Sequence, residues 1–154
     1  MRKALRVGTK RGIGRAFISG ALATQKLRKS RFSPLSVDCA FKDLATSDYV
    51  AIIVIGVKGR KRFILDVVNE HLDAAATEAA IRRLRDKYSP INAVLVEDRA
   101  NGPAVIQRLQ ANIPGVVPIN PKGGKIARMF AAAPEWQAHD WYIDRKAAWT
   151  GILY

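Results

Sequence analysis

The chain has one cysteine, two histidines and no long apolar run among its 154 residues. Cys39 alone cannot form an intramolecular disulfide, and a single thiol offers none of the spacings of a zinc site. This cysteine usage favours a reducing, cytosolic compartment. No apolar run approaches the ~20 residues of a membrane span, so we expect no membrane partner. Ser19 and Gly20 interrupt the one short apolar stretch near the start, which argues against a signal peptide.

Glycine-rich phosphate loops are also missing. Gly12-Ile13-Gly14 does not extend to a dinucleotide fingerprint and follows no strand. Gly123-Gly124-Lys125 lacks the upstream glycine and the following Ser or Thr of a nucleotide-binding loop. We therefore assign no residue to binding an organic cofactor.

Acidic residues are absent from 1–33, and this absence explains most of the net charge of +13. That segment holds ten Lys and Arg, which leaves sixteen basic and thirteen acidic residues in the rest of the chain. It has no lasting apolar period, so it is expected to be a basic arm or linker that can be disordered when alone. Such an arm could bind nucleic acid through counterion release, with Arg11 and Arg15 among its contacts, or be merely solvated.

Three acids lie within or directly after apolar runs that predict buried strands. Residues 93–96 (AVLV) predict a fully buried strand, which ends at Glu97 and Asp98. Asp38 lies within a second apolar run, 35–41, where an acid is costly unless it is paired or bound to a cation. Cys39 would face the opposite side of that strand and pack as a small core residue. The alternative is that these acids are structural or only solvated.

The rest of the pattern predicts one α/β domain over 34–154 with the order β-β-β-α-β-α-β-α. Asp73 is expected to cap a helix that ends near Tyr88. The expected elements are strands at 35–41, 49–57, 62–68, 91–97 and 116–119, and helices at 74–88, 103–111 and 125–134; residues 141–143 are compatible with a short further strand. The inner stripe of the first helix is expected to be Ala76, Ala80, Ile81, Leu84 and Tyr88.

That order, with acids in the first and fourth strands, resembles the ribonuclease-H-like nucleases. More closely, the chain resembles the C-terminal nuclease domain of phage terminase large subunits, over about residues 35–150. The matching segments are 37–43 (VDCAFKD), 47–49 (SDY), 63–67 (FILDV), 96–102 (VEDRANG) and 118–128 (PINPKGGKIAR). The resemblance implies a mixed five-stranded sheet flanked by helices, with the fourth strand beside the first.

The resemblance also implies a metal-dependent endonuclease that cuts double-stranded DNA in the host cytoplasm during genome packaging. Its cofactor would be Mg²⁺ or Mn²⁺ in a two-metal site, and its partners the terminase small subunit and portal. Asp38 and Glu97 match metal ligands and would be catalytic, with Asp98 and Asp48 as candidate accessory groups. Lys122 and Lys125 could hold DNA phosphates. Two carboxylates sharing metal ions should approach to about 4–7 Å.

The chain departs from the family pattern in ways that weaken this expectation. The family's third acidic motif, H-D-D-x-x-D-A, and its ATPase domain find no match, and Asp140 and Asp144 do not match the motif. We therefore expect a C-terminally incomplete domain, such as a prophage remnant, with an incomplete metal site and apolar surface exposed near Trp141 and Trp149. The alternatives are an inactive DNA-binding or packaging-interaction module, or a Holliday-junction-resolvase-like nuclease.

Overall fold

The computed structural model describes residues 33–39, 48–98 and 103–153. The predicted basic arm, including Arg11 and Arg15, lies outside these residues. No helix in the described parts of the chain is long and apolar enough to cross a bilayer.

A six-stranded mixed sheet forms the centre of the molecule, in the order β5-β4-β1-β2-β3-β6. β1, β2 and β3 pair in antiparallel fashion, whereas β1–β4, β4–β5 and β3–β6 are parallel. The ribonuclease-H-like architecture is confirmed, and β6, on the outer side of β3, brings the predicted five strands to six. The strands are β1 (Pro34–Asp38), β2 (Asp48–Lys58), β3 (Lys61–Leu72), β4 (Ala93–Glu97), β5 (Val116–Ile119) and β6 (Trp141–Ile143).

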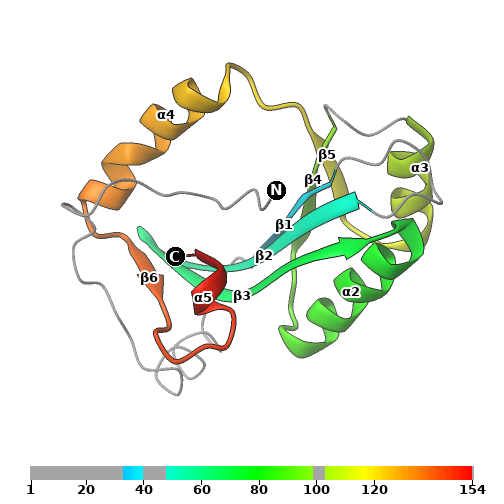
Figure 1. Cartoon of the computed structure of the whole chain (residues 1–154), viewed down its shortest axis with the longest axis horizontal. Helices are drawn as coiled ribbons and strands as arrows, with labels where there is room; N and C mark the ends of the chain where they lie inside the picture. The colour runs from blue at the N-terminus through cyan, green and yellow to red at the C-terminus, as the bar shows by residue number, and fades with distance from the viewer. Residues whose placement is uncertain (1–32, 40–47, 99–102, 154) are drawn as a thin grey trace.

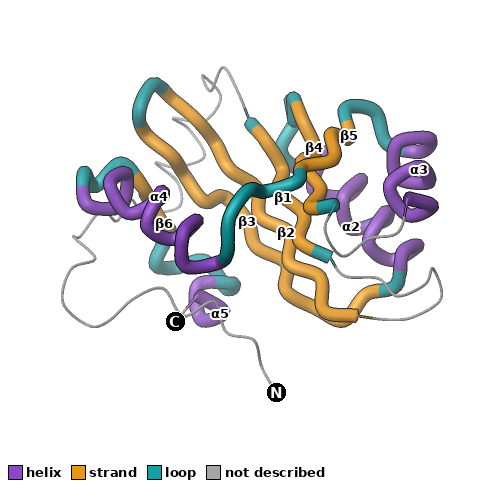
Figure 2. Tube along the Cα trace, turned by 90° about the horizontal axis from the view of Figure 1, so that it is seen from above, coloured by secondary structure: helices purple, strands orange, loops and turns teal. Residues whose placement is uncertain are grey.

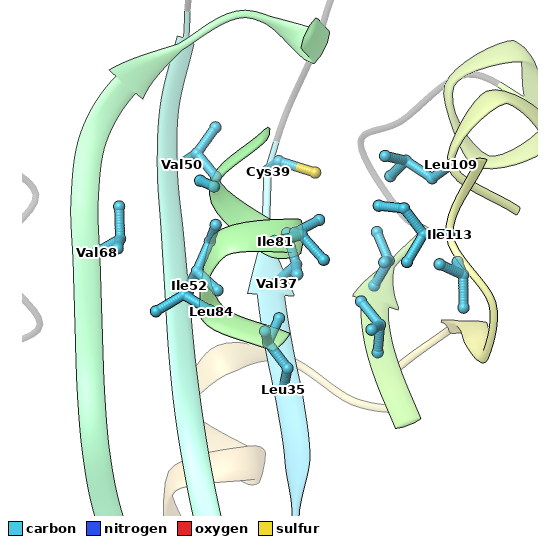
Figure 3. Packing of buried hydrophobic residues seen from close by; sticks show 14 of the residues in the cluster. Leu35, Val37, Cys39, Val50, Ile52, Val68, Ile81, Leu84, Leu109 and Ile113 are labelled. Carbon is cyan, nitrogen blue, oxygen red and sulfur yellow. The ribbon is translucent and has the colours of Figure 1, made fainter. Parts of the chain in front are cut away.

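One face of the sheet carries the hydrophobic core. Side chains alternate between faces along a strand, and Leu35 and Val37 of β1, like Val94 and Val96 of β4, are buried on this face. Figure 3 shows side chains of this core meeting residues of two helices, α2 (Ala74–Lys87) and α3 (Pro103–Asn112). Cys39 is 1% exposed and belongs to this core, as predicted. Asp38 and Glu97 therefore lie on the face of β1 and β4 that is opposite the core.

The helix α2 begins and ends close to the predicted positions. Asp73 is its N-cap, with Oδ1 accepting a 2.7 Å hydrogen bond from the Ala76 backbone N–H. The predicted stripe was wrong at Ala76, which is exposed, because the buried positions 77, 80, 81 and 84 follow the i, i+3, i+4, i+7 spacing of one helix face. Thr77 is buried instead, and its hydroxyl donates to Asp73 O at 2.7 Å.

A polar cluster fastens the end of α2 to β3. Lys87 Nζ lies 2.8 Å from Asp66 Oδ2, and the Tyr88 hydroxyl lies 3.0 Å from the same oxygen. The hydrogen bond to Asp66 raises the pKa of Lys87, whereas burial is the main cause that raises the pKa of Tyr88. Both groups are therefore held in their protonated forms, in which each can donate to Asp66.

The helix α4 (Lys125–Gln137) lies on the other side of the sheet from α2 and α3 (Figures 1 and 2). Near its end, Trp136 stacks on Trp141 of β6 with ring centroids 4.9 Å apart, and Arg62 pairs with Glu135 at 3.3 Å. The chain then continues through β6 to the short helix α5 (Thr150–Leu153).

The sequence predicted exposed apolar surface near Trp141 and Trp149. Both tryptophans are half-buried, and Ile152, three residues after Trp149, is 39% exposed. The large exposed apolar residues of α4 form one stripe, with Ile126 68%, Met129 58% and Phe130 72% exposed. The apolar stripe in the first half of α4 therefore does not pack against the sheet.

The core face predicts a clear difference between two aliphatic truncations. Leu84→Ala should lower the free energy of unfolding by about 2–5 kcal/mol, because Leu84 is 2% exposed and its removal leaves a cavity. Ile126→Ala, on the exposed stripe, should change it by no more than about 0.5 kcal/mol. Urea denaturation followed by circular dichroism measures both. Equal losses in the two variants would contradict this assignment of the core.

Candidate active site

The carboxyl ends of β1 and β4 lie next to each other. β1 is parallel to β4, with Leu35 opposite Val94 and Val37 opposite Val96. Asp38 and Glu97 are the next residues of these two strands, and each is the last residue of its strand. The prediction that the fourth strand lies beside the first is therefore confirmed. Adjacent strands are about 4.8 Å apart, so a carboxylate separation of about 4–7 Å is attainable and stays a prediction.

Alternation places the two acids on the same face. Val37 and Val96, one residue earlier in each strand, are both buried in the core. Asp38 is exposed and Glu97 is partly exposed, as expected for residues on the face opposite α2 and α3. A cation approaching from that side could meet oxygen atoms from both strands.

Arg128 of α4 contacts Glu97 across this face. Its Nη1 lies 3.3 Å from Oε1 and 3.4 Å from Oε2, so one guanidinium nitrogen is shared between both carboxylate oxygens. The Glu97 side chain is 25% exposed and that of Arg128 39% exposed. Solvent therefore reaches both partners, and the contact is a partly screened ion pair.

The two accessory candidates lie at the same edge of the sheet with less defined roles. Asp98 follows β4 directly; its backbone N–H donates to Ile119 O at 2.9 Å, and its side chain is exposed. Asp48 begins β2, three residues before Ala51, which pairs with Asp38. Its backbone is thus about 10 Å along the strand from the position opposite Asp38. The side chain of Asp48 is outside the described part of the structure.

The predicted phosphate-binding lysines follow β5 at this edge. Ile119 pairs with Glu97, and Lys122, three residues later, is exposed. Lys125 is the first residue of α4. The described backbone thus brings both lysines to the end of the sheet that carries the acids, which is compatible with the predicted role.

The chemistry of the donor set fits a hard divalent cation in part. Carboxylate oxygens are the ligands that Mg²⁺ and Mn²⁺ prefer. Within residues 33–39, 48–98 and 103–153, however, no three or more His, Cys, Asp or Glu side chains are grouped closely enough to hold a metal ion. The described residues therefore offer two neighbouring carboxylates, which suits one weakly held ion better than a closely spaced pair.

Arg128 is the residue at this site to which sequence reasoning assigned no role. It stands within the matched segment 118–128, but its partner is 31 residues away. Only the path of the loop after β5 and the placement of α4 opposite the core bring the two together. One feature of the sequence pointed to this contact: Arg128 lies in the first turn of the helix that follows β5, and β5 is the strand beside Glu97.

The strand order and pairing are those of a ribonuclease-H-like domain of the terminase type. Residues 35–153 match the family described as the terminase RNaseH-like domain, and the chain belongs to this family. No curated protein sequence matches the chain.

Solved structures of large terminases have the same fold. A large terminase from a thermophilic bacteriophage aligns with 84% of the chain at 9% identity and a TM-score of 0.64. The nuclease domain of the bacteriophage SPP1 large terminase with bound Mn aligns with 86% at 14% identity and 0.58. The large terminase nuclease of the thermophilic phage G20c with bound magnesium aligns with 75% at 14% identity and 0.59. The chain spans 31%, 71% and 59% of these three chains, respectively.

Proposed function

We propose that this chain is a divalent-metal-dependent endonuclease domain that cuts double-stranded DNA during phage genome packaging. The observation that carries this proposal is the parallel register of β1 and β4, which brings Asp38 and Glu97 to neighbouring positions on one face of the sheet. Membership of the terminase family and the metal-bound relatives support the same assignment.

Asp38 and Glu97 would hold the metal through their carboxylates. A bound Mg²⁺ or Mn²⁺ would activate a water and stabilise charge at the scissile phosphate. The roles of the chain's own residues are to fix the ion at the edge of the sheet and to orient the DNA beside it. Lys122 and Lys125 would contact phosphates that flank the cut, since they follow β5, whose last residue, Ile119, pairs with Glu97.

Removing the first acid should weaken metal binding. We expect the full chain to bind Mn²⁺ weakly, and Asp38→Asn to bind at least about tenfold more weakly, because one of two charged ligands is lost. Asp140→Asn is the control. Asp140 pairs with Arg60 beside β6, which is the outermost strand on the side of the sheet away from β4. Electron paramagnetic resonance of free Mn²⁺ measures the affinities. Plasmid nicking should be slow and should vanish in Asp38→Asn.

Two outcomes would count against this function. Equal Mn²⁺ affinities for the wild type and Asp38→Asn would remove Asp38 from the site. Rapid Mg²⁺-dependent nicking that survives Asp38→Asn would show that the activity resides elsewhere.

A DNA-holding module is the second candidate, favoured by the charge of residues 1–32. This segment holds ten basic residues and no acid. Each phosphate that such residues neutralise releases counterions, so binding would be tight at low salt and nearly independent of sequence. The lysines at the carboxyl edge could extend this contact toward the proposed metal site.

Deleting residues 1–32 should remove most of the DNA affinity. Ser33 is kept because its backbone N–H donates to Asn92 Oδ1 at 2.8 Å. We expect the affinity of the full chain to fall steeply with salt, and the shortened chain to show a much shallower salt dependence. Fluorescence anisotropy with a labelled duplex measures both. Equal affinities for the two proteins would exclude the arm as the main contact.

We also propose, from family membership, that the domain acts in the host cytoplasm with the terminase small subunit and the portal. The domain organisation that we propose is a basic arm over residues 1–33, followed by the nuclease domain over residues 34–154.

A further inference from the structure

The first half of α4 reaches the sheet through Arg128. Its apolar residues Ile126, Met129 and Phe130 are exposed and form no core. The second half is attached independently, by the stack of Trp136 on Trp141 and by the Arg62–Glu135 pair. The contact between Arg128 and Glu97 therefore joins the less firmly packed end of the helix to the proposed metal site.

Arg128 and a metal ion would use the same atoms. The guanidinium nitrogen lies within 3.4 Å of both carboxylate oxygens of Glu97. A divalent ion bound to either oxygen would lie within a few ångströms of the guanidinium, and the repulsion between the two cations is only partly screened at a half-buried site. The Glu97 carboxylate therefore cannot bind the metal ion and keep its close contact with the Arg128 guanidinium at the same time.

We propose that Arg128 sets the metal affinity of the site by competing with the divalent ion for Glu97. This inference rests on the proposed metal site. Before the ion binds, Arg128 neutralises Glu97 and holds the start of α4 against the sheet. When the ion binds, the guanidinium leaves the carboxylate, and the first half of α4 loses its attachment there. Arg128 is thus a positioning residue and not a metal ligand.

Mn²⁺ binding by the full-length wild type and three variants tests this competition. Arg128→Gln should bind Mn²⁺ about three- to tenfold more tightly than the wild type, because the competing charge is gone. Arg128→Lys should lie between them, since a lysine ammonium lacks the planar fork of a guanidinium. Glu97→Gln combined with Arg128→Gln should lose the gain.

Arg62→Gln is the matched control. It removes the same charge from an Arg–Glu pair of the same length, 3.3 Å, at the other end of α4. Its Mn²⁺ affinity should stay within about twofold of the wild type, because the lost charge does not contact Glu97. An equal gain in Arg62→Gln and Arg128→Gln would reduce the effect to net charge and overturn the proposal.

Hydrogen exchange gives a readout that does not depend on the substitutions at 128. Mn²⁺ should speed exchange of the backbone amides of 126–131 in the wild type and leave them unchanged in Asp38→Asn. Unchanged amides in a wild type that binds Mn²⁺ would contradict the release of α4.

The outcomes separate this inference from the proposed function. If Asp38→Asn binds Mn²⁺ at least about tenfold more weakly than the wild type, and Arg128→Gln binds it no more tightly than the wild type, the competition is wrong and the metal site stands. If neither the wild type nor Arg128→Gln binds Mn²⁺, both proposals fail. Binding by Arg128→Gln alone would be the strongest support for competition.

Discussion

The parallel pairing of β1 with β4 is the constraint on which the proposed site depends. Two acids that are 59 positions apart in sequence become neighbours only because Val37 pairs with Val96. The buried valines also fix which face the acids occupy, since a shift of one residue in either strand would move its acid to the core side. The packing of α2 and α3 thus stabilises the register that the proposed chemistry needs.

Positively charged side chains lie near the two acids of the proposed metal site. The face with the acids receives Arg128 from α4, and the loop after β5 brings Lys122 to the same edge. A site for a metal and a polyanionic substrate benefits from cations close to its acids, provided that they can exchange partners. The Arg128–Glu97 pair is partly exposed, and the apolar stripe of α4 beside it is not buried. Under the proposal, a metal ion can therefore displace Arg128 from Glu97.

Much of the fold could be predicted because its elements are local. The apolar run 93–96, the Asp73 cap and the strand at 116–119 each carry their own pattern, and the structure has all three. The pairing of β1 with β4 came from the family resemblance and not from any periodicity. Ala76 was misplaced because alanine fits either face of a helix, and its neighbour Thr77 satisfies its buried hydroxyl by bonding to Asp73 O.

The Arg128–Glu97 contact could not be predicted, because it depends on how a glycine-containing loop returns across the sheet. β6 has only three residues, and its pairing with β3 is equally a product of tertiary structure. The roles of Asp38 and Glu97 remain predictions that rest on register and family.

The most direct test is a crystal structure with Mn²⁺, with the ion located by its anomalous scattering. We predict a peak within about 2.5 Å of oxygens from both Asp38 and Glu97, with Arg128 turned away from Glu97. A peak elsewhere, or carboxylates that lie more than ~12 Å apart or on opposite faces of the sheet, would refute the proposed metal site.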